Sequence, residues 1–145
     1  MDIEIIKYIE KIEGYKTALK SLHWAAKNMS EHKLMDEFSD ILTDYEDELA
    51  EVAQGVYGTI KLNTIKPLLY KVQSSKKCFN DILKDTNNFH NTLKGDKLKG
   101  LRSIVESFLA EVDKHIYLLD FCVNEDKERT IYKKIIREVL QRNFD

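Results

Sequence analysis

Four potential metal ligands lie along one side of a single predicted helix: His32, Asp36, Asp47 and Glu51. At about 100° per residue they fall within roughly a third of the helix circumference. The apolar residues of the same segment gather on the other side, at Leu34, Phe38, Ile41, Tyr45, Leu49 and Val52. Imidazole and carboxylate are ligands that iron and manganese accept. Because the four ligands face away from the core of this chain, their placement predicts a metal site between subunits.

A solvated acidic surface is the alternative interpretation, because further carboxylates surround these ligands at Glu37, Asp40, Asp44 and Glu48. The Glu-x-x-His pairs that project into di-metal helical bundles are absent from the sequence, since Glu111 and His115 are four residues apart. If a metal binds, the missing ligands are therefore expected from a neighbouring copy.

Composition predicts an all-helical chain. Its 145 residues suit one domain with a sizeable core, and they include one Pro, five Gly and 33% charged residues. The net charge of −2 gives no global reason to expect binding to nucleic acid or to an anionic membrane. The acidic start and the lack of a long apolar run predict a soluble, cytoplasmic protein. Cys78 and Cys122 match no metal-binding spacing and are expected to be reduced, buried thiols.

Apolar residues recur at three- and four-residue steps along four long segments. They predict helices over about 2–27, 30–56, 67–93 and 98–123, with Ser30 as an N-cap and Pro67 in a first turn. Short connections make a four-helix bundle the expected architecture for 1–123. A polar break at 124–129 then predicts a separate C-terminal extension over 124–145.

The extension is expected to form a fifth, amphipathic helix with a basic side at Lys133, Lys134 and Arg137. One interpretation is that it packs on the bundle or on a sister subunit. The other is that it docks on an acidic protein partner.

Two stretches resemble the Dps miniferritins, the DNA-binding proteins from starved cells. The first is Leu22-His23-Trp24 followed by His32-x3-Asp36 and Asp47-x3-Glu51, and the second is the run from Asp113 to Leu118. The two stretches occur in the family's order on the expected helices.

The resemblance implies a ferritin-like bundle and a ferroxidase centre for iron detoxification or storage, shared across a twofold interface of a homo-oligomer. His23, His32 and Asp36 would come from one chain, and Asp47 and Glu51 from its partner. Fe(II) is the implied metal, oxidised by peroxide or oxygen, although the ligand types fit manganese as well.

Neighbouring residues leave alternatives open. Trp24 beside His23 is either a one-electron donor to the site or an interface aromatic, and His23 is either a ligand or a core histidine. His115 is expected to be a packing or interface histidine.

The chain departs from the family at two places. The interval from His23 to His32 is about three residues shorter, and the connection after the second predicted helix leaves no room for the family's small interface helix. No lysine-rich tail precedes the first helix, so we expect no DNA binding at physiological salt. A structural role is the competing hypothesis, with an inactive bundle serving as an oligomerisation module, for example in a phage particle. A DinB-type bundle that binds another divalent metal is a third.

Overall fold

The computed structural model describes residues 2–60 and 64–144 of the chain. Four α-helices account for most of them, with a short 3-10 helix, η2 (Asp96–Leu98), before the last: α1 (Asp2–Ala25), α2 (Met29–Tyr57), α3 (Ser75–His90) and α4 (Lys99–Phe144). The described residues contain no β-strand. The prediction of an all-helical chain is confirmed.

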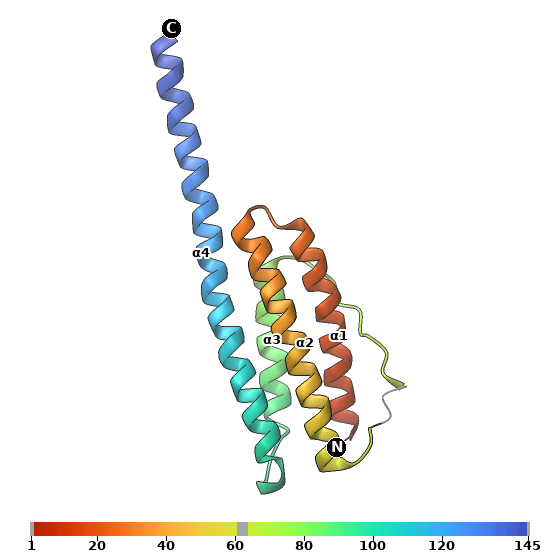
Figure 1. Cartoon of the computed structure of the whole chain (residues 1–145). Coiled ribbons are helices and arrows are strands. Elements are labelled where there is room, and N and C mark those ends of the chain that lie inside the picture. The colour runs from red at the N-terminus through yellow and green to blue at the C-terminus, as the bar shows by residue number, and fades with distance from the viewer. Residues whose placement is uncertain (1, 61–63, 145) are drawn as a thin grey trace.

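The helices pack side by side in the cyclic order α1, α2, α4, α3 (Figure 1). Large aromatic side chains fill the centre: Phe38 contacts Phe79 with ring centroids 4.7 Å apart, and Tyr45 stacks on Phe108 at 3.8 Å. These rings come from three different helices, so their burial holds α2, α3 and α4 together.

The turn between α1 and α2 is fixed by Asn28. Its side-chain oxygen accepts from the backbone N–H of Glu31 at 2.8 Å, and its amide nitrogen donates to the carbonyl of Cys122 in α4 at 3.3 Å. Asn28 is therefore the N-cap of α2, and the prediction that Ser30 takes this role is wrong. The same side chain ties the turn to α4.

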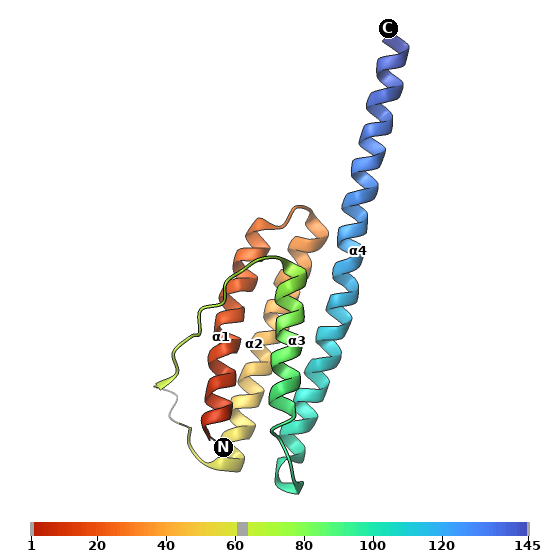
Figure 2. The ribbon, with the colours of Figure 1, turned by 180° about the vertical axis from the view of Figure 1, so that it is seen from behind.

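Residues 64–74 form a strap that crosses α1 instead of the expected first turns of the third helix (Figure 2). The backbone N–H groups of Lys66 and Leu68 donate to the side chain and the carbonyl of Glu10, both at about 2.8–2.9 Å. The backbone of the strap is thus hydrogen-bonded to α1 and not within a helix of its own. The helix predicted from Pro67 therefore begins only at Ser75.

α4 continues well beyond the other three helices (Figure 1). Its 46 residues span about 69 Å at 1.5 Å per residue. The expected break at 124–129 and the separate fifth helix are wrong, because this stretch holds charged helix formers and neither Gly nor Pro. The apolar side chains of residues 131–140 remain exposed.

Within the described residues, no helix is both long enough and apolar enough to cross a membrane.

Candidate metal centre

His23 and His32 lie against each other where α1 ends and α2 begins. Their rings stack with centroids 3.7 Å apart and planes 23° apart. The Nδ1 atom of each ring lies 2.8 Å from the backbone carbonyl oxygen of the other residue. Because a carbonyl oxygen only accepts hydrogen bonds, both Nδ1 atoms carry a proton.

This pairing defines which nitrogen could bind a metal. In a neutral imidazole with a proton on Nδ1, the lone pair is on Nε2. The carbonyl bonds also restrain the orientation of each half-buried ring, as the outer partners of metal-binding histidines commonly do. The structure thus brings His23 and His32 together with two Nε2 atoms suited to ligation.

The predicted carboxylate ligands all belong to α2 and are exposed. Asp36 lies one turn after His32, on the same side of the helix. Asp47 and Glu51 follow eleven and fifteen residues after Asp36, which corresponds to about 16 and 22 Å along the axis. One chain therefore brings together the two histidines and keeps Asp47 and Glu51 away from them.

No group of three or more His, Cys, Asp or Glu side chains in the described ranges has the geometry to hold a metal ion. The α2 sequence nevertheless contains nine carboxylates and a single lysine, Lys33. Most of these carboxylates are exposed on the side of α2 that faces away from the core. This side of α2 is called the acidic face below, and Asp36, Asp47 and Glu51 belong to it.

Glu46 is the one buried carboxylate of α2. Its Oε1 atom lies 3.1 Å from Lys16 Nζ, while its Oε2 atom makes no hydrogen bond. Burial raises the pKa of the Glu46 carboxyl, and the Lys16 ammonium only partly offsets that effect. Glu46 therefore belongs to the packing between α1 and α2 and not to the acidic face.

Trp24 follows His23 directly, and 72% of it is exposed. The Trp24 side chain is therefore not part of the core of its own chain. As an interface aromatic it would need a neighbouring chain, and as an electron donor it would need a bound reactant.

His115 lies in the core, in agreement with its expected role as a packing histidine. It is fully buried, its Nδ1 donates to the carbonyl of Glu111, and its Nε2 makes no hydrogen bond. Glu37 of α2 is the nearest carboxylate to Nε2, at 3.8 Å. The i, i+4 spacing of Glu111 and His115 was the available signal, but the position of Glu37 depends on the packing of α2 against α4. Only one carboxylate approaches Nε2, which is too few ligands for a metal site.

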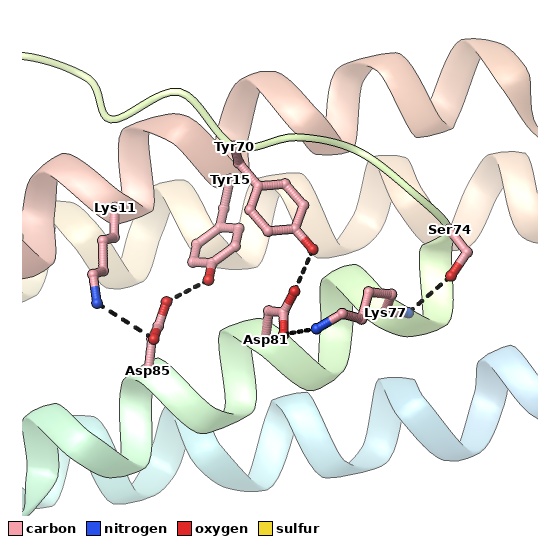
Figure 3. A network of polar contacts seen from close by, with 7 residues as sticks. All are labelled: Lys11, Tyr15, Tyr70, Ser74, Lys77, Asp81 and Asp85. Atoms are coloured by element: carbon pink, nitrogen blue, oxygen red, sulfur yellow. Dashed lines mark hydrogen bonds and ion pairs between the residues drawn. The ribbon is translucent and has the colours of Figure 1, made fainter.

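A second polar cluster joins the strap, α1 and α3 (Figure 3). Tyr15 donates to Asp85, which also pairs with Lys11 at 3.4 Å. Tyr70 of the strap donates to Asp81 at 2.6 Å, and Lys77 pairs with the same carboxylate at 2.6 Å. Burial and the neighbouring carboxylates raise the pKa values of both phenols.

The partners in this cluster hold the strap in place. Both carboxylates already accept from a phenol and a lysine, so neither is free to act as a base. A small hollow of ≈ 250 Å³ lies beside them. Sequence reasoning missed this cluster because Tyr15 and Asp85 are seventy residues apart.

A wider surface hollow than the one beside Asp81 and Asp85, ≈ 940 Å³ in volume, lies where the ends of α1 and α3 meet α4. Its charged lining consists of Lys27, Glu31 and Lys76, and Glu31 is occupied by a hydrogen bond from Ser75. None of the predicted ligands lines it.

Comparison with known proteins gives one match. Residues 23–119 match the model of a family described as "Family of unknown function (DUF5856)". This range contains all five predicted ligands and leaves out most of α1 and the far half of α4. No curated protein and no solved structure matches the chain significantly.

Proposed function

The chain belongs to the DUF5856 family, whose function is unknown, and we propose that it is a Dps-like ferroxidase that binds Fe(II) between two copies. In this proposal the four packed helices are a ferritin-like bundle. Iron is the substrate, and peroxide or oxygen is the oxidant. Detoxification or storage of iron would be the outcome.

The observation that carries the proposal is the symmetry of the ligands along the exposed side of α2. His32 and Asp36 are four residues apart, and so are Asp47 and Glu51. A twofold axis at the level of Ile41 and Leu42 therefore brings Glu51 of a second copy opposite His32, and its Asp47 opposite Asp36. Isologous interfaces of this kind are the commonest in homo-oligomers. Two equivalent sites result, about 22 Å apart along α2.

The donor atoms suit the proposed substrate. Each site would combine the Nε2 atoms of His23 and His32 with the carboxylates of Asp36 and of the second copy's Asp47 and Glu51. Nitrogen and oxygen donors without thiolate fit Fe(II), and hard carboxylate oxygens favour Fe(III) as the charge rises. Manganese fits the same donors, so the test below includes it.

The chemistry at a site with two ferrous ions is balanced. Two Fe(II) ions give up one electron each, and one hydrogen peroxide molecule takes two electrons and two protons to form two water molecules. The paired transfer avoids release of hydroxyl radical. Trp24, adjacent to His23, is the residue proposed to donate one electron when a single iron is bound.

Charge links metal binding to assembly. Two acidic faces repel each other when they pack, because Lys33 is the only lysine of α2. Divalent cations at the shared sites would offset this repulsion. We therefore propose that the α2 faces associate only when the metal is bound.

Anaerobic titration with Fe(II), followed by peroxide, tests the proposal. We expect saturable binding of about two irons per site and fast formation of ferric absorbance that Asp47→Asn/Glu51→Gln abolishes. The matched control is Asp44→Asn/Glu48→Gln, which makes the same charge change with the same spacing on α2. Equal oxidation rates in all three proteins, or in protein and buffer, would reject the ferroxidase. A parallel titration with Mn(II) compares the two metals.

Mixing two inactive variants tests whether the site is shared. His32→Ala retains the Asp47 and Glu51 half, while Asp47→Asn/Glu51→Gln retains the histidine half. In a mixed dimer one of the two sites is complete, so an equimolar mixture should regain about a quarter of the wild-type activity by random pairing. A site built within one chain would regain none.

A structural role is the second candidate, favoured by the exposed apolar side chains on the far half of α4. In that case the bundle would be an inactive oligomerisation module, with a virion as one location. Isolation of a metal-free monomer with no affinity for a larger assembly would count against this role.

A further inference from the structure

The far end of α4 has an apolar side and a cationic side. Its apolar side consists of five large side chains, each 41–66% exposed: Tyr132, Ile135, Ile136, Val139 and Leu140. At about 100° per residue, these five fall within roughly 140° of the helix circumference. An apolar stripe of this width is typical of a helix that lies against a surface. Residues 132–142 are called the α4 tip below.

Four exposed cations surround the apolar side of the α4 tip: Lys133, Lys134, Arg137 and Arg142. On the helical wheel, Lys133 lies about 20° beyond Leu140. Arg142 lies about 20° beyond Ile135, so each edge of the apolar side carries a cation. Glu138 is the one carboxylate of the tip. Positive charge is therefore concentrated at the tip, although the whole chain has a net charge of −2.

The α4 tip lies apart from the bundle. Both views of the molecule show the C-terminal end of α4 extending past the other three helices, with no other segment alongside it (Figures 1 and 2). The hollow beside Leu22 and Ala25 reaches along α4 only as far as Ile131. The described part of this chain therefore leaves the apolar side of the tip uncovered.

The α4 tip is poorly suited to pairing with the tip of a second copy. A coiled-coil seam through Tyr132, Ile135 and Val139 would next reach Arg142 at one end and Glu128 at the other. It would contain only three apolar layers, whereas coiled coils are typically sustained over about three or more heptads. Each tip also carries four cations and one carboxylate, so two tips repel each other.

An anionic phospholipid surface matches both sides of the α4 tip. The apolar side chains of a surface-bound helix enter the boundary between headgroups and acyl chains, and nearby cations attract the anionic lipids. Long Lys and Arg side chains reach the headgroups while their methylene stems cover apolar surface. Glu128 shares the apolar side of the helix one turn before Tyr132, so the contact begins at Tyr132.

We propose that the α4 tip binds the surface of an anionic phospholipid bilayer, with its apolar side in the headgroup region and Lys133 and Arg142 on lipid phosphates. The helix lies on the bilayer and does not cross it. This contact is separate from the proposed metal-dependent contact through α2.

Co-sedimentation with vesicles in the presence of a metal chelator tests the proposal. The vesicles consist of phosphatidylcholine alone or with about 30% phosphatidylserine, and we expect the wild-type chain to bind the anionic vesicles more than about tenfold more tightly. Ile135→Gln/Val139→Gln keeps the charge of the tip and should weaken this binding by more than about tenfold. Ile3→Gln/Leu69→Gln is the matched control, because it removes two exposed apolar side chains from the bundle, and it should bind as the wild type does.

The cations at the two edges are tested separately. Lys133→Gln/Arg142→Gln should weaken binding to the anionic vesicles by more than about tenfold and leave binding to the neutral vesicles unchanged. Lys94→Gln/Lys97→Gln makes the same charge change before the start of α4 and should bind as the wild type does. Circular dichroism verifies that every variant is folded, since the α4 tip lies outside the core.

Other results would overturn the proposal. The first is a wild-type chain that does not bind the anionic vesicles. The second is equal binding by Ile135→Gln/Val139→Gln, which would mean that the cations attract any polyanion. The third is a lipid-free dimer that the same variant dissolves, which would show that a second copy covers the apolar side. Asp47→Asn/Glu51→Gln should bind vesicles as the wild type does, so the outcome is independent of the proposed ferroxidase.

Discussion

Gly14 of α1 and Leu68 of the strap approach so closely that a side chain at position 14 has no room. A Cβ atom on Gly14 would overlap the carbonyl oxygen of Leu68, which is backbone and cannot turn aside. The strap is therefore docked on a glycine in the middle of a helix, where glycine itself is unfavourable.

Gly14→Ala should destabilise the protein by roughly 1–3 kcal/mol, because the strap must shift and loses its bonds to Glu10. Urea unfolding measures the effect. Gly55→Ala is the control, since a Cβ there meets nothing within 4 Å. It should stabilise the protein by roughly 0.5–1 kcal/mol. Equal stabilisation by both changes would show that the strap does not rest on α1.

The histidine pair predicts a tautomer. In their neutral forms, His23 and His32 should carry the proton on Nδ1, because each Nδ1 donates to a carbonyl. Nitrogen-15 NMR distinguishes the two tautomers. His90, whose Nε2 lies 3.0 Å from Glu106 Oε1, should show the opposite tautomer in the same spectrum. A proton on Nε2 of His23 or His32 would contradict the reciprocal pairing.

Glu46 should make stability depend on pH. Burial raises its pKa in the folded protein above the ordinary 4.5, so over the interval above 4.5 the folded state holds a proton that the unfolded state has released. The free energy of unfolding should therefore fall as the pH rises through that interval. Glu46→Gln lacks this dependence, so its stability relative to wild type should increase with pH.

Urea unfolding at several pH values from 4 to 8 measures this difference, with the exposed Glu48→Gln as the control for the change in charge. A relative stability of Glu46→Gln that stays flat across the range would be inconsistent with a raised pKa.

Cys78 should be inert in the folded protein. It is fully buried, and burial, with a contribution from Asp81, raises the pKa of its thiol to about 12. In the Cys122→Ser variant, Cys78 is the only thiol. Its reaction with an aromatic disulfide reagent at pH 8 should be about a thousandfold slower than in the urea-unfolded chain. Equal rates would mean that the core around α3 opens readily.

The spacing of apolar residues predicted the helices correctly where burial of one helix side determines the structure. The wheel of α2 correctly separated buried Leu34, Phe38 and Leu49 from exposed Asp36. The start of α3 was wrong by eight residues, because bonds from the strap to Glu10 join positions far apart in sequence. The break at 124–129 was wrong because polar composition alone does not end a helix.

The candidate site was predictable only in part. The exposure of Asp47 and Glu51 followed from helical spacing. The stacking of His23 on His32 depends on the turn at Asn28, whose bond to the Cys122 carbonyl no local pattern reveals. The proposed sharing of ligands between copies remains a prediction.

The unbroken course of α4 makes it a rigid spacer whose length and helical phase are both set by the number of residues. An insertion of seven residues between Cys122 and Ile131 would lengthen it by about 10 Å and turn the far end by only about 20°. An insertion of two residues would turn the far end by about 200° and bring its apolar side round toward the chain's own bundle. The number of residues in α4 therefore determines whether the apolar side of its far end faces other molecules or the chain's own bundle.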